Sequence, residues 1–240
     1  MKKLFLFVSV VIIFTASSCS SYDYFPSQQQ VLLFKKENDT HFSIGVSPYT
    51  TTVTIGHAFS DYVGFVSSAK FLESFQDMNN SDNFLFDNEL VIYKRFKNRL
   101  MIASNFGYGM GQYRKYDLYN DPYMTRLSRF YIQPSFGFSL KCFDFAVSLR
   151  VSQANFDVHS QEMHYDSEES YYSLTPVIKE VTNGYAFFFE PALTIGTGYD
   201  WLKFRVQPTT LLSLFDDADG KYILEEPSVN FSVHVTYDFE

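Results

Sequence analysis

Four charged residues stand where a strand pattern predicts an inward-facing side chain: Glu89, Arg150, Glu190 and Arg205. Each takes a polar position in a segment that alternates polar and apolar residues. Buried charges persist when they are paired, so we expect a network of ion pairs. Arg150 and Glu190 would lie at similar height on adjacent strands, and we expect an ion pair between them. Such a network would fill the interior of a narrow barrel. Gating of a pore and contact with a substrate are the alternative roles.

His41 and Ser43 are two residues apart and therefore share one face of an expected strand. A hydrolase could use the serine as nucleophile and the histidine as its base, provided that a carboxylate oriented the imidazole. No supporting motif surrounds the two residues. We therefore expect a hydrogen-bonded polar pair and no catalytic residues.

Two further patterns resemble ligand sites without matching them. The alternate glycines between Gly107 and Gly111 lie inside an expected strand, whereas a nucleotide-binding loop opens a helix. The acidic stretch from Asp217 to Glu226 partly matches a calcium loop, but Phe215 stands at the first ligand position. We expect glycines that face a barrel interior and a solvated loop, with neither a metal nor a cofactor.

The elements that must position these residues are strands, because apolar and polar residues alternate with a period of two. The pattern is clearest from Val229 to Phe239, where six apolar residues interleave with polar ones. Ten segments follow it: 40–47, 50–60, 61–71, 84–94, 99–112, 128–141, 143–155, 185–198, 201–214 and 228–239. This predicts an all-β, antiparallel, up-and-down barrel of the outer-membrane type with about ten strands. Eight strands stay open as an alternative, because the first hairpin, around Pro48, is the least regular.

Connections between these segments alternate in length, with short turns after four strands and long polar loops over 72–83, 113–127, 156–184 and 215–227. Short turns at one end and long loops at the other are typical of outer-membrane barrels. The polar faces of the strands hold mostly small uncharged residues, which suits a packed interior. A soluble lipocalin-like barrel, the rival interpretation, would carry many charges on that face.

Two details of strand pairing follow from the sequence. Pro134, Pro191 and Pro208 each interrupt a strand, and each removes a ladder hydrogen bond. We expect bulges or a local break in pairing at one height of the barrel. A turn at Tyr199–Asp200 would place Gly196 opposite Lys203, and a turn at Cys142–Phe143 would place Ser135 opposite Arg150.

The N-terminus has the layout of an exported protein. Lys2 and Lys3 precede an apolar run and small residues ahead of Cys19, which predicts a signal peptide over 1–18 and a lipobox with acylation at Cys19. Plain cleavage near Ser18 is the alternative. We expect a lipidated tether over 19–39 and a β-barrel domain over 40–240.

The charge and the cysteines exclude several classes. Without the two leader lysines, 17 basic and 27 acidic residues give a net charge of about −10, which argues against nucleic-acid partners. Cys142 is the only other cysteine, so no disulfide forms within the mature chain.

The sequence resembles a family of uncharacterised outer-membrane-barrel lipoproteins of Gram-negative bacteria. The shared features are the lipobox with the Tyr/Pro tether from Tyr22 to Pro26, the stretch from His57 to Gly64, Glu89 on an aromatic strand, the alternating glycines, and the stretches 132–137 and 189–193. The likeness covers most of residues 19–240, but its motifs are loose, and His57 stands where an aromatic is expected. It implies a membrane barrel with no established activity.

We therefore expect an outer-membrane barrel lipoprotein, anchored by lipid in the cell outer membrane, with a structural or surface-interaction role. Outer-membrane lipid is one expected partner, and a surface ligand bound by the long loops is another. A periplasmic lipocalin-like barrel that binds lipid and a barrel-type hydrolase are the alternatives.

Overall fold

The structure is a computed structural model that describes residues 28–31, 34, 36–47, 50–72, 83–96, 99–116, 122–140, 142–165, 174–199, 201–216 and 228–238. All regular elements in these ranges are strands. Within the same ranges, no helix is long and apolar enough to cross a membrane. The predicted signal peptide, Cys19 and the acidic stretch from Asp217 to Glu226 lie outside the described residues.

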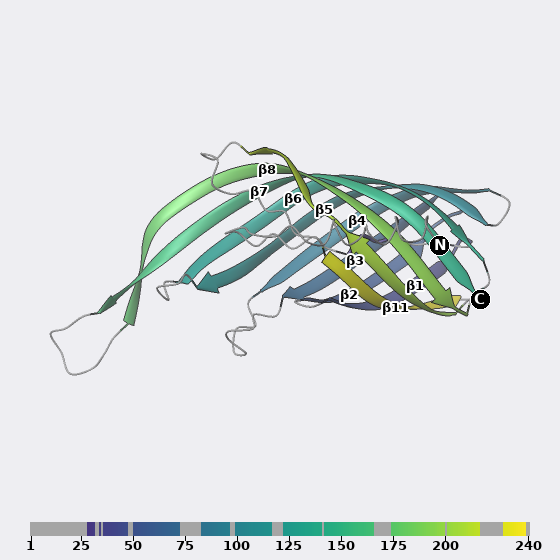
Figure 1. The fold of residues 1–240 in the computed structure, drawn as a ribbon, viewed down its shortest axis with the longest axis horizontal. Coiled ribbons are helices and arrows are strands. Elements are labelled where there is room, and N and C mark those ends of the chain that lie inside the picture. The colour runs from purple at the N-terminus through teal and green to yellow at the C-terminus, as the bar shows by residue number, and fades with distance from the viewer. Residues whose placement is uncertain are drawn as a thin grey trace, which may run out of the picture.

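The described residues form eleven strands that belong to one antiparallel sheet (Figure 1). In chain order they are β1 (Asp39–Ser47), β2 (Thr50–Ala58), β3 (Val63–Leu72), β4 (Phe84–Phe96), β5 (Leu100–Tyr116), β6 (Pro122–Ser139), β7 (Phe143–Tyr165), β8 (Leu174–Gly198), β9 (Leu202–Thr209), β10 (Leu212–Asp216) and β11 (Ser228–Asp238).

The sheet closes on itself, because its two ends meet. Strands β1 to β8 pair in chain order, β1 also pairs with β11, β11 pairs with β9, and β9 pairs with β8. Strand β10 follows β9 along the same edge of β8. The segments β9 and β10 thus correspond to the single predicted strand 201–214, and the ten predicted strands each have a counterpart in the wall.

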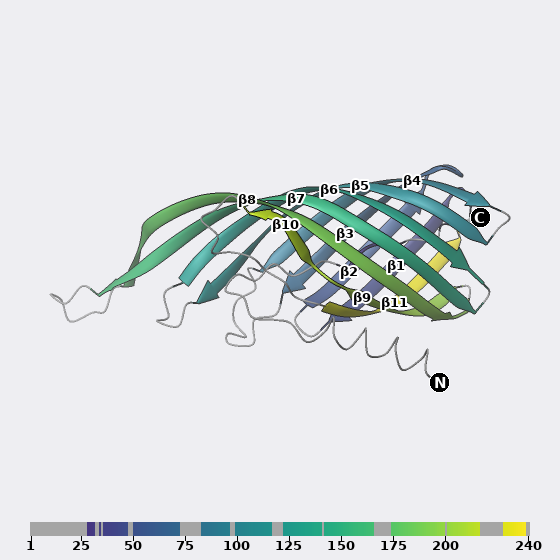
Figure 2. The ribbon, with the colours of Figure 1, turned by 45° about the horizontal axis from the view of Figure 1, so that its top comes forward.

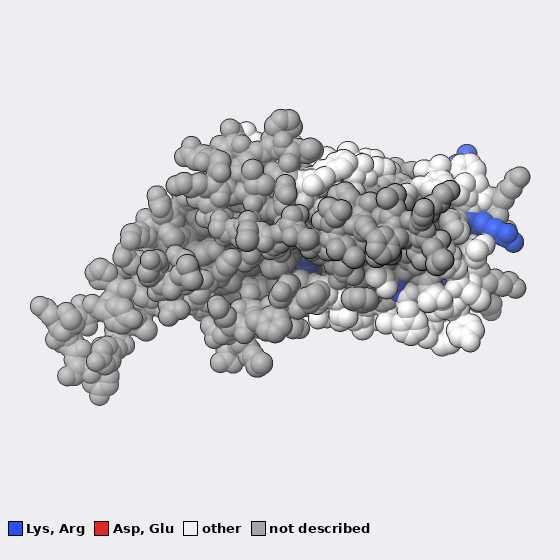
Figure 3. Space-filling model, in the orientation of Figure 1, with Lys and Arg blue, Asp and Glu red and all other residues white. Residues whose placement is uncertain are grey.

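The two faces of the wall differ sharply in polarity. Inward-facing residues are mostly polar or small, and outward-facing residues are mostly large and apolar. Most of the described surface visible in Figure 3 is uncharged, with the most prominent group of basic side chains at the end that holds the short turns. The lipocalin-like alternative needed the apolar face inside, so it is wrong for this chain.

The strands β5 to β8 are longer than the sequence pattern predicts. They extend far beyond the rest of the wall at the end opposite the short turns (Figure 2). Much of the predicted loops 113–127 and 156–184 is therefore strand. Alternation in the sequence marks strands that have one apolar and one polar environment, and it stops before these strands end.

The register of two hairpins differs from the prediction by two residues. Backbone hydrogen bonds join Tyr199 to Leu202 and Leu140 to Phe143, so each turn starts one residue away from its predicted place. As a result Gly196 lies opposite Arg205. A shift of two residues keeps every side chain on its face, so alternation cannot distinguish the two registers.

The predicted break in pairing near the prolines is confirmed. The ladder between β6 and β7 skips Pro134, passing from Ile132–Val151 to Ser135–Ser148. On the edge of β8 that faces away from β7, the ladder with β9 skips Pro208, and the partner changes from β9 to β10 beside Pro191. The missing proline N–H groups account for these interruptions.

Candidate functional site

The interior of the barrel is filled by a segment that precedes the first strand. Gln28, Gln29, Gln30, Val31 and Phe34 are all buried, each at most 5% exposed. The sequence pattern predicts a tether outside the domain for these residues, but they lie within the lumen. We call residues 28–34 the lumen segment, of which Gln28–Val31 and Phe34 are described.

A tight turn carries the chain from the lumen into the wall at the end with the short turns. Asn38 adopts a left-handed backbone (φ 63°), a conformation that Asn tolerates better than most residues. Its N–H donates to the carbonyl of Ala58, 2.9 Å away. Strand β1 starts at the next residue, Asp39.

Hydrogen bonds attach Gln29 to one side of the barrel. Its backbone N–H donates to Oε1 of Gln207 on β9, and Nε2 of Gln207 donates to the carbonyl of Gln29, both at 2.8 Å. The side chain of Gln29 donates to the carbonyl of Glu190 on β8. One residue therefore joins two neighbouring strands.

Gln30 is attached to the opposite side. Its carbonyl accepts hydrogen bonds from Asn105 on β5 (3.0 Å) and Gln133 on β6 (3.1 Å). Its side chain donates to Oγ1 of Thr54 on β2, 2.9 Å away. With the bonds of Gln29, the segment contacts five strands around the barrel, so a single extended chain spans the cross-section of the lumen.

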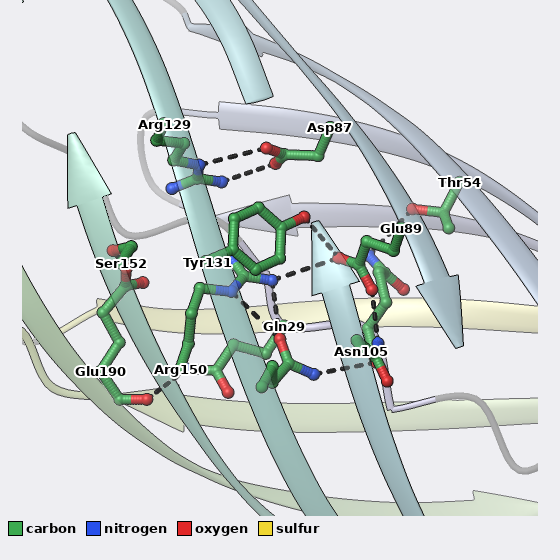
Figure 4. Close-up of polar contacts among 12 residues, drawn as sticks. Gln29, Thr54, Asp87, Glu89, Asn105, Arg129, Tyr131, Arg150, Ser152 and Glu190 are labelled. Atoms are coloured by element: carbon green, nitrogen blue, oxygen red, sulfur yellow. Dashed lines mark hydrogen bonds and ion pairs between the residues drawn. The ribbon is translucent and has the colours of Figure 1, made fainter. Parts of the chain in front are cut away.

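A group of buried charges surrounds the segment at this height (Figure 4). The carboxylate of Glu89 on β4 lies 3.4 Å from Nη2 of Arg150 on β7 and accepts a hydrogen bond from the hydroxyl of Tyr131 at 2.8 Å. Asn105 donates to its second oxygen. The Arg150 guanidinium also donates to Oε1 of Gln133.

Tyr131 lies between two guanidinium groups. The centre of Arg150 is 4.3 Å from its ring centroid, and that of Arg129 is 5.2 Å away. Arg129 forms a bidentate pair with Asp87, at 2.6 and 3.1 Å (Figure 4). The absence of a side chain at Gly107 leaves room for the ring, because a Cβ there would lie 2.1 Å from it.

A second ion-pair cluster lies nearer the short turns. Asp144 on β7 bonds to Lys203 and, at 2.9 Å, to Arg205, both on β9. Ser139 donates to the same carboxylate at 2.6 Å. Arg205 also donates to the carbonyl of Val31 at 3.3 Å, so this cluster too holds the lumen segment.

Apolar side chains lie on either side of the Glu89 layer. Toward the short turns, Phe34 packs with a cluster of Ala58, Val66, Val91, Tyr93, Met101 and Ala103. Toward the long loops, a second cluster contains Leu85, Leu127, Ala154, Ala186, Phe188 and Leu211. The inward-facing residues of β4 show the order: Leu85, Asp87, Glu89, Val91 and Tyr93. The polar layer is therefore bounded by apolar packing above and below.

The four residues predicted as one network are distributed over these clusters. All four are buried, and Arg150 and Glu190 are register partners on β7 and β8. Arg150 contacts Glu89, as described above. Glu190 accepts a hydrogen bond from Ser152 at 3.2 Å. Arg205 pairs with Asp144. The lumen segment bonds directly to Glu190 and Arg205, and it reaches Glu89 and Arg150 through Asn105 and Gln133.

Sequence reasoning missed Asp87, Arg129, Asp144 and Lys203 as members of these clusters, although each occupies an inward position of a predicted strand. It also missed the lumen segment. Three consecutive uncharged amide side chains, Gln28 to Gln30, were the available signal, since glutamine can satisfy buried donors and acceptors without adding charge.

His41 and Ser43 both face the lumen and are buried. Nε2 of His41 lies 3.1 Å from Asp39, and the ring packs edge-on against Phe34 at 5.3 Å. The imidazole thus has a carboxylate partner, but the ring packs against Phe34 of the lumen segment. Among the described residues, no group of three or more His, Cys, Asp or Glu side chains could hold a metal ion.

A closed antiparallel sheet with an apolar outer face, a polar packed interior, short turns at one end and projecting hairpins at the other defines an outer-membrane-type β-barrel.

Solved structures of such barrels are similar to this chain. The outer-membrane protease OmpT from Escherichia coli is 8% identical, with a TM-score of 0.49 over 86% of this chain and 97% of OmpT. The N-terminal β-barrel domain of Pseudomonas aeruginosa OprF is 8% identical, with a TM-score of 0.38 over 84% of this chain and 99% of that domain. The KdgM porin, in complex with disordered oligogalacturonate, is 10% identical, with a TM-score of 0.37 and the same coverage. No family model and no curated protein matches the sequence.

Proposed function

We propose that this chain is an outer-membrane lipoprotein whose barrel spans the bilayer as a sealed scaffold and presents its projecting hairpins as a contact surface. The observation that carries the proposal is the polarity of the wall, with apolar residues outside and a packed polar interior. In water this arrangement would expose a large apolar surface, which is the mark of a membrane or protein contact.

The height of the apolar face supports a spanning position. On β5, outward-facing residues are mostly apolar from Leu100 to Met110, and Gln112 follows. Ten steps of about 3.3 Å, along a strand tilted by about 40°, give a band about 25 Å tall, as in outer-membrane barrels. Beyond the corresponding height on β6 and β7, the outward residues Arg126, Asn155 and Asp157 are polar.

The packed interior supports a scaffold rather than a pore. Arg129, Gln133, Arg150 and Glu190 are each 0% exposed, and the lumen segment bonds to Gln133 and Glu190. A hydrolytic role would need access to His41 and Ser43, but both are buried, and His41 packs against Phe34. We accordingly propose no catalytic activity, and we assign recognition of a surface ligand to the ends of β5 to β8 and their loops.

The test is fractionation of a Cys19→Ala variant that carries a cleavable non-lipoprotein signal peptide. A spanning barrel stays in the outer-membrane fraction after carbonate extraction and is released only by detergent. Release by carbonate would overturn the spanning position. Wild-type protein reconstituted in planar bilayers is expected to show no steady conductance, and open single-channel steps would contradict the sealed lumen.

A further inference from the structure

We infer that the N-terminus of the mature chain leaves the barrel through the end that carries the long loops, so that Cys19 and its acyl chains contact the outer leaflet at the cell surface. The inference rests on the proposed function for one point, namely that the end with the long loops faces outward. The direction of the chain itself comes from the lumen segment.

The described residues fix the direction in which the segment runs. Phe34 packs with Tyr93 and Met101 near the short turns, whereas Gln29 and Gln30 bond to Glu190, Gln207 and Asn105 at the polar layer. Going back along the sequence from Phe34 to Gln29, the chain therefore moves away from the short turns and toward the long loops.

The packing leaves little room for the chain to turn back. At the polar layer, Gln29 and Gln30 reach β2, β5, β6, β8 and β9, so one chain already spans the lumen. Nearer the short turns, the buried cluster around Phe34 and the ion pairs of Asp144 lie in the interior beside the segment. A second strand of chain running down to the short turns would have to displace both.

The polarity of the sequence matches the order of the layers. Phe34 belongs to the apolar cluster nearer the short turns, and Gln29 and Gln30 bond to the polar layer. The residues that precede them, Tyr22 to Pro26, are rich in aromatic and apolar side chains. Such a composition suits contact with the second apolar cluster, which contains Leu85, Leu127 and Phe188 on the long-loop side of the polar layer.

The length of the chain is also sufficient. Nine residue steps separate Gln28 from Cys19 and span up to about 30 Å when extended. On β6, the outward apolar band ends at Phe130, three residues from Gln133 at the polar layer, or about 10 Å along the strand. Cys19 can thus leave the lumen and reach the leaflet beside the barrel mouth.

The experiment is cysteine labelling with a membrane-impermeant maleimide in intact and lysed cells. Native Cys142 is exposed beside a short turn and reports the periplasmic end. Two variants in a Cys142→Ala background report the other positions: Ser21→Cys next to the lipid anchor and Asp219→Cys in the loop between β10 and β11.

We expect Ser21→Cys and Asp219→Cys to be labelled in intact cells, and Cys142 only after lysis. Labelling of Ser21→Cys only after lysis, or only after denaturation, while Asp219→Cys is labelled in intact cells, would overturn the threaded N-terminus alone. If Asp219→Cys is also protected in intact cells, the orientation or the membrane location is wrong, and both proposals fail. A heat-dependent shift of the folded band in gel electrophoresis verifies that each variant has folded.

Discussion

Arg150 and Glu89 form an ion pair across the interior of the barrel, with Nη2 and Oε1 3.4 Å apart. Their strands, β7 and β4, are not neighbours, since β5 and β6 lie between them. Tyr131 on β6 contacts both side chains, through its hydroxyl to Glu89 and its ring face to Arg150. The pair therefore joins parts of the wall that the hydrogen-bonded ladders do not connect directly.

The substitution Glu89→Gln is expected to destabilise the barrel by about 3 to 5 kcal/mol, because it leaves buried positive charge without its partner. Urea unfolding in lipid vesicles, followed by tryptophan fluorescence, measures the change. The control is Asn88→Ala, on the outer face of the same strand, which should change the free energy of unfolding by about 1 kcal/mol or less.

A double variant, Glu89→Gln with Arg150→Met, separates charge from packing. Removing both charges should recover part of the stability lost by Glu89→Gln. If the two effects simply add, the ion pair does not explain the cost of the single substitution.

Gly107→Ala is expected to cost about 1 to 3 kcal/mol, because its methyl group overlaps the ring of Tyr131 and forces it away from Glu89. Removing the ring should relieve the overlap. In a Tyr131→Ala background, the same glycine substitution should therefore cost much less. Equal costs of Gly107→Ala in the two backgrounds would show that the close contact with Tyr131 is not the cause.

The strands and their faces could be predicted from the sequence because lipid outside and a packed polar interior impose a period of two. The same signal limits what can be predicted. It cannot fix a register that is shifted by two residues, as at Gly196, and it fades in the projecting ends of β5 to β8.

The partners within the candidate site were harder to predict than its members. Glu89, Arg150, Glu190 and Arg205 were expected inside, and they are buried. The partner of Arg205 is Asp144. The two residues lie opposite Gly196 on either side of β8, and Arg205 takes this position only in the true register of β8 and β9. The described residues of the lumen segment, Gln28–Val31 and Phe34, are neither strand nor helix, so they carry no periodicity that would distinguish them from a tether.

Gln207→Leu is expected to loosen the lumen segment, because it removes two hydrogen bonds that hold the backbone of Gln29. The buried peptide groups left unsatisfied should cost about 2 to 4 kcal/mol together. Hydrogen exchange measured by mass spectrometry should rise in peptides that contain residues 28–31. Gln153→Leu on the outer face of β7 is the matched control, and it should leave this exchange unchanged.

Phe136→Arg tests whether the outer face of the barrel lies in lipid. Phe136 is 42% exposed on β6, within the apolar band, and a charge at the midplane of a bilayer costs a spanning barrel about 2 to 4 kcal/mol. Asn155→Arg on β7 lies outside the band and should cost about 1 kcal/mol or less. Urea unfolding of both variants in vesicles measures the free energy of unfolding, and it compares a position within the apolar band with one outside it. Equal effects would mean that the apolar band does not lie at membrane depth, and a stabilising effect of Phe136→Arg would place this face in water.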